Sequence, residues 1–176
     1  TKSFTHIATK SIPIDERFFC LSASVILVSI NCDLIKIKGQ EKVDLKSFKQ
    51  SVGEIAHYIP ENALLIIEST VPPGTCEKII YPMVKDIFEK RSLNIDNFYL
   101  AHSYERVMPG KNYLSSIINF WRVFSAINKK SEKKCEEFLS KVINTDEYPL
   151  VCLQNITASE TGKILENSFR AVNIAF

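Results

Sequence analysis

The sequence predicts an α/β fold in which part of a parallel sheet runs into a long helix. Short apolar runs rich in β-branched residues alternate with longer segments in which apolar residues recur at helical spacing. The short runs are apolar at consecutive positions, which is typical of strands buried on both faces of a parallel sheet. We therefore expect an α/β domain over residues 1–155 and a helix over 156–176 that lies beyond it.

The elements are expected in a regular order along the chain. Strands are predicted at 24–29, 63–68, 98–103, 120–127 and 148–153, and helices at 44–58, 75–90, 131–142 and 157–176. Asp44 and Ser131 are candidate N-caps, and Pro82 predicts a kink or a late start of the second helix. The Lys-rich segment 35–42, which contains Gly39, is expected to be a flexible loop.

Composition excludes several classes of protein. With 45% hydrophobic residues, the 176-residue chain can bury a sizeable core. A net charge of +2 gives no general electrostatic reason to expect nucleic acid or an anionic membrane as a partner. The longest apolar stretch, 25–30, is far shorter than the ~20 residues of a membrane helix. We expect a cytoplasmic protein with neither kind of partner.

The five cysteines and three histidines do not predict a metal site. No Cys-x-x-Cys pair is present, and the histidines lie far from one another and from any cysteine spacing that suits zinc. Reduced thiols and no bound metal are therefore expected. The chain begins without Met and stops inside a helical pattern, which we interpret as a piece of a longer protein.

In an open α/β sheet, ligands bind just beyond the carboxyl ends of the strands, so the functional residues are expected there. After the second predicted strand, segment 68–75 (ESTVPPGT) places two hydroxyls at the strand end, followed by a stiff Pro-Pro-Gly turn. Ser69 and Thr70 are candidate ligand-binding residues. The alternative is that both only satisfy backbone groups of the turn while Thr75 caps the next helix.

Two further places carry candidate residues. Segment 103–110 (SYERVMPG) follows the third predicted strand, and its Glu105 and Arg106 either act on a substrate or pair with each other at the surface. In the last helix, Glu160, Lys163 and Asn167 share a face. The Lys163 ammonium and the Asn167 amide, one turn apart, suit a common oxygen, although a solvated polar stripe has the same spacing.

Three segments in this order resemble the UDP-glucose/GDP-mannose dehydrogenase family. Segment 67–75 resembles the family's E-S-T-V-x-P-G-T motif, 104–110 its P-E-R-x-x-P-G motif, and 160–176 its E-x-x-K-x-x-E-N-x-x-R-A-x-N-I-A helix. The resemblance extends over roughly residues 4–176. It implies that 1–155 is an incomplete, Rossmann-like NAD-binding domain and that 156–176 begins the central, dimer-forming helix.

The resemblance also implies an activity and a set of catalytic residues. The family oxidises the C6 alcohol of a nucleotide sugar to a carboxylate in two NAD-dependent hydride transfers. Lys163 and Asn167 would stabilise the oxyanion at C6, with Lys163 also accepting its proton. Thr70 would hold the hydrolytic water, and Glu105 would act as acid and base in thioester hydrolysis.

Binding residues follow from these motifs and from segment 24–31, which resembles the strand before the family's S-V-[NP]-T-P turn. The residues implied to contact NAD are Asn31, Ser69 and Thr70, and those implied to contact the nucleotide sugar are Arg106, Val107, Lys163 and Asn167. The expected substrate is a nucleotide sugar, with a UDP-sugar favoured, and the expected assembly is a homodimer.

The chain departs from the family pattern at four places. It contains neither the glycine-rich first turn G-x-G-x-x-G nor the G-G-x-C-x-P segment with the catalytic thiol. Cys32-Asp33 stands where the family has Thr-Pro, and Tyr104 stands where it has Pro. We therefore expect the isolated chain to be inactive. Two alternatives stay open: a non-catalytic assembly relative of the family, and another Rossmann oxidoreductase that acts on hydroxy acids.

Overall fold

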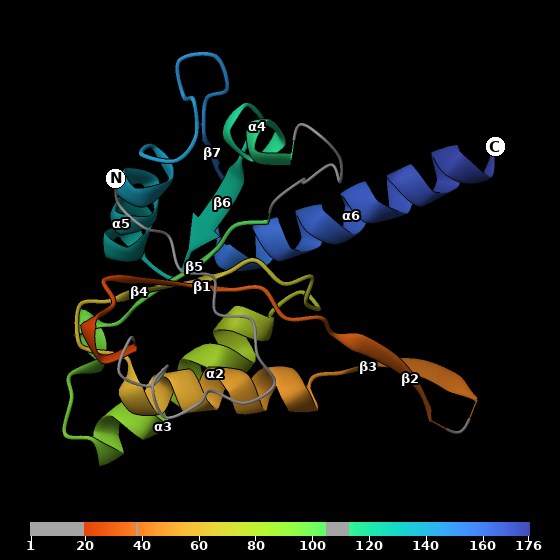
Figure 1. The fold of residues 1–176 in the computed structure, drawn as a ribbon. Helices are drawn as coiled ribbons and strands as arrows, with labels where there is room; N and C mark the ends of the chain where they lie inside the picture. Colours follow the sequence, from red (N-terminus) through yellow and green to blue (C-terminus); the bar gives the residue numbers. More distant parts are fainter. Residues whose placement is uncertain (1–19, 38, 105–112) are drawn as a thin grey trace.

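A computed structural model describes residues 20–37, 39–104 and 113–176, and its centre is a five-stranded sheet (Figure 1). The strand order is β1-β4-β5-β6-β7. The strands are β1 (Val25–Val28), β4 (Leu64–Ile67), β5 (Tyr99–His102), β6 (Val123–Ala126) and β7 (Val151–Cys152). The predicted α/β class and the predicted positions of all five strands are confirmed.

The sheet is parallel only in part. β1, β4 and β5 pair in parallel, whereas β6 runs antiparallel to β5, and β7 runs parallel to β6. A parallel neighbour needs a crossover that carries the chain back to the starting edge, usually along a helix packed on the sheet. The described part of the connection from β5 to β6 contains only the short helix α4 (Tyr113–Ile118), so β6 starts at the edge where β5 ends.

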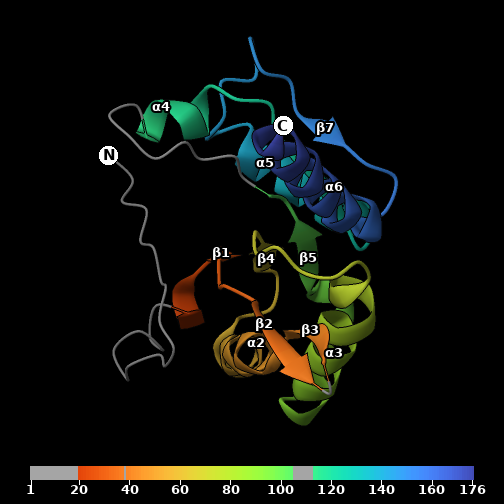
Figure 2. The ribbon, with the colours of Figure 1, turned by 90° about the vertical axis from the view of Figure 1, so that its right-hand side faces the viewer.

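Helices cover both faces of the sheet. The helices are α2 (Lys46–Tyr58), α3 (Tyr81–Lys90), α5 (Lys129–Leu139) and α6 (Ile156–Ala175), with a π-helix η1 (Cys76–Ile80) before α3 and a 3-10 turn η2 (Ile95–Asn97) before β5. Figures 1 and 2 show α2 and α3 on one side of the strands and α5 on the other. The helical segment begins with η1, close to the predicted start at Thr75, so the predicted late start at Pro82 is not found. The change from π-helical to α-helical geometry occurs at Tyr81, directly before Pro82.

The central strand β4 explains why its sequence is apolar at every position. Leu65 and Ile67 pack with the cluster under α2 and α3, whereas Leu64 and Ile66 pack with the cluster under α5. Each of the four side chains is at most 1% exposed. Successive side chains of a strand point to opposite faces, so a strand with a helix layer on each face must be apolar throughout.

Both predicted helix caps were wrong by a few residues. α2 starts after Leu45, and the Asp44 carboxylate, one residue before this N-cap, accepts from the backbone N–H of Lys46 (2.8 Å). α5 is capped by Asn128, whose side-chain oxygen accepts from the N–H of Ser131 (2.9 Å). Ser131 itself is buried inside α5, where its hydroxyl accepts from the N–H of Leu100.

The expected loop at 35–42 is instead a β-hairpin, which corrects that prediction. Strands β2 (Asp33–Ile37) and β3 (Gln40–Asp44) pair antiparallel, with Ile37 opposite Gln40. Gly39 has a φ of +78°, as a two-residue hairpin turn requires. Apolar and Lys residues alternate before this turn, which is the pattern of a half-exposed strand. The Lys content and Gly39 had instead favoured a loop.

A second correction concerns the aromatic residues before β6. The predicted strand 120–127 includes Trp121, but the strand begins at Val123 and Trp121 is 56% exposed. Its ring packs edge-on against Tyr148, at 5.4 Å between ring centroids. Phe124, which pairs with Cys152 of β7, is buried.

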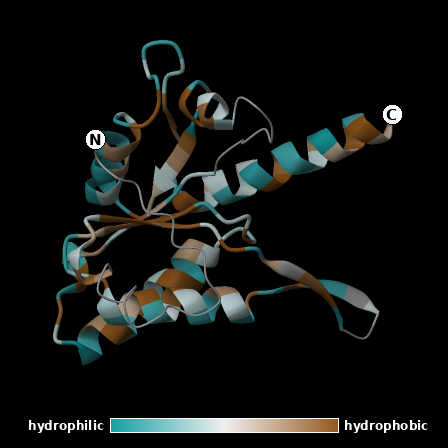
Figure 3. Ribbon diagram, viewed as in Figure 1, coloured by the Kyte–Doolittle hydropathy of each residue, from teal (hydrophilic) through white to brown (hydrophobic). Residues whose placement is uncertain are grey.

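α6 is anchored at its start and projects from the body at its end (Figure 1). Its buried residues are Ile156, Ser159 and Glu160, all in the first two turns. Large apolar side chains of the projecting part are exposed, namely Leu165, Phe169, Val172, Ile174 and Phe176. Figure 3 shows hydrophobic and hydrophilic residues alternating along the ribbon of α6. Of the helices that the structure describes, none is long and apolar enough to cross a membrane.

Two phenylalanines distinguish core from surface in a stability measurement. Phe88 is fully buried and its ring packs edge-on against Phe98, whereas Phe169 is 73% exposed. Phe88→Ala should lower the free energy of unfolding in urea by about 3–5 kcal/mol, because it leaves a cavity. At a protein concentration low enough to keep the chain monomeric, Phe169→Ala should change it by less than about 0.5 kcal/mol. Equal losses would contradict the described core.

Candidate functional site

The strand register brings the predicted site segments to one edge of the sheet. Val28 pairs with Ile67, and Ile67 pairs with His102, so three parallel strands end side by side. The segments that follow β1, β4 and β5 therefore emerge together. β6 begins at the same edge, because it is antiparallel to β5. Of the predicted residues, Asn31 lies three residues beyond β1 and Thr70 three residues beyond β4, and both are exposed.

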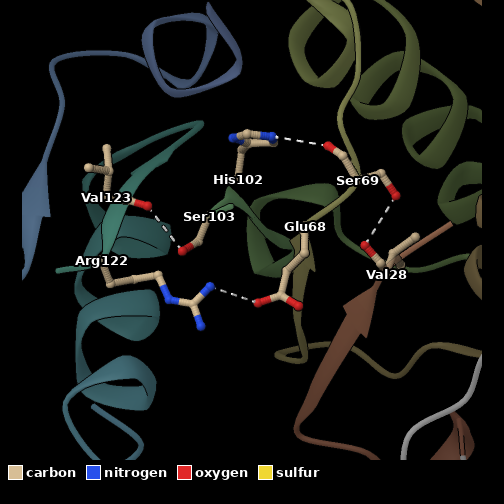
Figure 4. Close-up of polar contacts among 7 residues, drawn as sticks. All are labelled: Val28, Glu68, Ser69, His102, Ser103, Arg122 and Val123. Carbon is tan, nitrogen blue, oxygen red and sulfur yellow. Dashed lines mark hydrogen bonds and ion pairs between the residues drawn. The ribbon is translucent and has the colours of Figure 1, made fainter. Parts of the chain in front are cut away.

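Ser69 joins the ends of β1 and β4. Its side chain is buried, and its hydroxyl accepts from the N–H of Ile30 (2.7 Å) and donates to the carbonyl of Val28 (3.4 Å) (Figure 4). The Ser69 hydroxyl thus satisfies backbone groups, as the alternative without a ligand expects. Its contact to NAD stays a prediction.

The Pro-Pro-Gly sequence forms the stiff turn that was predicted. Thr75 donates through its N–H to the carbonyl of Pro72 (3.1 Å), and Gly74 has a φ of +88°. A proline followed by a residue with positive φ is typical of a type II turn. The Thr75 hydroxyl also donates to Pro72 (2.6 Å), so it closes the turn and does not cap the helix.

The buried carboxylate of Glu160 binds this turn. One oxygen accepts from the N–H of Gly74 (2.5 Å) and the other from the N–H of Cys76 (2.8 Å). The side chain is completely buried, 84 residues along the chain from Cys76. Glu160, Lys163 and Asn167 were expected to share a face, and along it exposure increases from the buried Glu160 to the half-buried Lys163 and the exposed Asn167. The sequence did not predict that Glu160 holds the start of η1. A carboxylate at a helix N-terminus also interacts favourably with the helix dipole.

A second buried network holds α6 from its other side. His102 Nδ1 lies 2.8 Å from the Ser159 hydroxyl, which lies 2.6 Å from the Ser125 hydroxyl. His102 Nε2 lies 3.4 Å from the carbonyl of Ser69 (Figure 4). A carbonyl can only accept, so Nε2 carries the proton and Nδ1 accepts from Ser159. The network thus links β4, β5, β6 and α6.

An ion pair connects the end of β4 with the start of β6. Arg122 Nη1 lies 3.4 Å from Glu68 Oε1, and both side chains are nearly buried (Figure 4). Ser103 donates to the carbonyl of Val123 nearby (3.1 Å). Sequence reasoning missed Arg122, because its partner is 54 residues away along the chain and no local spacing marks the pair.

Lys163 lies against the segment that follows β5. Its ammonium is 5.2 Å from the centre of the Tyr104 ring. Gly162 makes room for this ring, since a Cβ there would lie 3.3 Å from the Tyr104 hydroxyl. Lys163 is half-buried and Asn167, one turn further, is exposed. The structure therefore brings Lys163 to the carboxyl edge, while the predicted Glu105, Arg106 and Val107 lie outside the described residues.

The buried cysteines Cys76 and Cys135 do not have the character of nucleophiles. Burial raises the pKa of the Cys135 thiol to about 12. Burial and the nearby Glu160 carboxylate raise the pKa of Cys76 well above its ordinary value. Both thiols are therefore protonated at neutral pH. Among the residues that the structure describes, no group of His, Cys, Asp or Glu side chains could hold a metal ion.

The buried His102 should make folding stability depend on pH. Burial lowers the pKa of His102 to about 4, the Ser69 carbonyl opposes this, and the positive charge of Lys163 adds to it. Between pH 6.5 and 4 the unfolded chain therefore binds a proton that the folded chain does not, and stability falls as pH falls through this range. The free energy of unfolding is measured in urea at pH 7 and at pH 4. From pH 7 to pH 4, the wild-type value should fall by roughly 3 kcal/mol more than the value for His102→Gln.

The exposed His57→Gln is the matched control for that titration. It should lose as much stability as wild type over the same range. Equal losses in wild type and His102→Gln would contradict a buried, neutral imidazole.

The family profile and the similar proteins point to the same family. Residues 15–143 match the profile described as "UDP-glucose/GDP-mannose dehydrogenase family, NAD binding domain". The chain is 32% identical over 170 residues to the UDP-N-acetyl-D-mannosamine dehydrogenase of Methanococcus vannielii, which covers 97% of this chain and 34% of that relative. It is 31% identical to the enzyme of that name from Escherichia coli K12, over 89% of this chain and 38% of the relative.

The fold agrees with this match. The solved structure of UDP-D-ManNAc dehydrogenase from Pyrococcus horikoshii has a TM-score of 0.75 and 29% sequence identity, over 90% of this chain and 35% of that one. The chain thus spans about a third of the length of the relatives it matches. On the profile match and on these relatives, the chain belongs to the UDP-glucose/GDP-mannose dehydrogenase family.

Proposed function

We propose that the chain is part of an enzyme that oxidises the C6 alcohol of UDP-N-acetyl-D-mannosamine to a carboxylate with NAD. The observation that carries this proposal is the 32% identity over 97% of the chain to a UDP-N-acetyl-D-mannosamine dehydrogenase. The Escherichia coli and Pyrococcus horikoshii relatives bear the same substrate in their names. Family membership argues against the hydroxy-acid oxidoreductase alternative, since the match is to nucleotide-sugar enzymes.

The carboxyl edge of the sheet fits the NAD that the family profile implies. Asn31 and Thr70 are exposed at corresponding positions beyond two paired parallel strands, where dinucleotides lie in this type of sheet. Ser69 fixes the separation of those two strand ends through Ile30 and Val28. When bound there, NAD would accept hydride from the sugar. Asn31, Ser69 and Thr70 would hold it on the β1–β4 side.

Lys163 supplies the proton chemistry in this proposal. As hydride leaves C6, its hydroxyl must lose a proton, which the neutral amine form of Lys163 would accept; the ammonium so formed and the Asn167 amide would then both hydrogen-bond the C6 oxygen. The base at Lys163 is oriented by its contact with Tyr104. Thr70 would position the hydrolytic water, Glu105 would transfer protons in thioester hydrolysis, and Arg106 and Val107 would line the sugar-nucleotide site.

The exposed stripe of α6 supports a homodimer, because Leu165, Phe169 and Val172 have no cover in one copy of the described chain. A second α6 laid along this stripe would bury them. The free cysteines among the described residues fit a cytoplasmic protein. Light scattering that gives a monomer at micromolar concentration would contradict the dimer.

The activity is tested on the product of the whole reading frame in which this chain lies. With NAD and UDP-N-acetyl-D-mannosamine, absorbance at 340 nm should report about two NADH per sugar, because oxidation from alcohol to carboxylate removes four electrons. UDP-glucose and GDP-mannose are the comparison substrates and should react more slowly. Binding of the sugar without any NADH would favour the non-catalytic relative and contradict the proposal.

Replacing the Lys163 ammonium should lower turnover. Lys163→Met keeps the length of the side chain but removes the amine, and with it both the proton acceptor and the positive charge that forms once the amine is protonated, so kcat should fall by about 10²–10⁴-fold. The matched control is Lys130→Met on the exposed start of α5, which should leave kcat unchanged. Equal kcat in both variants would remove Lys163 from the mechanism.

A further inference from the structure

Adjacent residues of α6 bind two different parts of the sheet edge. Ser159 forms hydrogen bonds with His102 of β5 and Ser125 of β6. Glu160 accepts hydrogen bonds from Gly74 and Cys76, in the turn after β4. Both side chains are completely buried. Because neighbouring helix residues point about 100° apart, two such contacts fix both the position of α6 and its rotation about its own axis.

The Glu160 contact is specific to a carboxylate. Its two oxygens accept one backbone N–H each, and a buried carboxylate is tolerated only where such donors satisfy it. It occupies the N-terminus of η1, a place where other folds of this class bind a ligand's phosphate. In this chain the anion at that helix end is a side chain of α6, so the contact joins two elements of the protein.

Lys163 and Thr70 lie on either side of this contact. Lys163 follows Glu160 by three residues, which places it on the next turn of the same side of α6. Thr70 precedes the Pro72–Thr75 turn on the same short segment that Glu160 holds. The contact therefore sets how the residue from α6 stands relative to the residue from the end of β4.

We propose that Glu160 is a positioning residue, which fixes Lys163 of α6 relative to Thr70 by binding the backbone of the turn between β4 and η1. The inference rests on the proposed function, in which Lys163 and Thr70 act on the same substrate. It adds a residue that touches neither substrate nor cofactor. A displacement of about 1 Å between catalytic groups can cost ~10²-fold in rate, so loosening this contact should affect catalysis more than binding.

The test uses Glu160→Gln in the product of the whole reading frame. The amide keeps the shape of the side chain, but its NH2 faces one backbone N–H where an acceptor is needed. We expect kcat to fall about 10–100-fold with the KM for sugar nearly unchanged. The pH at which kcat is half-maximal should also move, because the surroundings of the Lys163 ammonium change.

Two controls separate positioning from loss of stability. Phe88→Ala removes a core ring far from this contact in the fold and should lower the melting temperature without altering kcat per folded molecule or its pH profile. Glu77→Gln changes an exposed carboxylate inside η1 and should alter neither stability nor kcat. All variants are assayed at a temperature where circular dichroism shows them folded.

Each outcome has a defined meaning. A lower kcat and a shifted pH profile in Glu160→Gln, with both controls like wild type, support the inference. Wild-type kcat and pH profile in Glu160→Gln overturn it and leave the proposed function intact. Absence of turnover by the wild-type protein with every nucleotide sugar overturns both.

Discussion

The rest of the site depends on one buried carboxylate. Glu160 binds the N–H groups of Gly74 and Cys76, and through them α6 is fixed against the turn that follows β4. In the part of the chain that the structure describes, the Ser159 network and apolar packing also join the end of β4 to the start of α6, but neither holds the backbone of the turn after β4. A charged group with two directed acceptors defines geometry more narrowly than apolar contacts do.

The sheet edge provides the surface on which this contact acts. Ser69 ties β4 to β1, and the ion pair of Glu68 with Arg122 ties it to the start of β6. His102 stays neutral because burial lowers its pKa, so the network at β5 adds no charge next to Lys163. Hydrogen bonds and one ion pair thus hold the strand ends together at this edge, and the Lys163 ammonium lies beside the Tyr104 ring.

The sequence was sufficient for the parts of the fold that depend on local pattern. The apolar run of β4 and the helical spacing of α2 predicted their elements, and motif order predicted the family. Partners distant in sequence were not predictable: Gly74 and Glu160 are 86 residues apart, which leaves no spacing signal, so the buried contact of Glu160 with the turn was missed. The antiparallel β6 was missed for the same reason, because strand direction depends on the path of the connection.

Amide hydrogen exchange at Gly74 and Cys76 tests the central contact most directly. If Glu160 holds both N–H groups in a buried site, they should exchange as slowly as the amides of β4, and Glu160→Ala should accelerate these two while β4 stays protected. Exchange at Gly74 and Cys76 as fast as in an exposed turn of the wild-type chain would contradict the account.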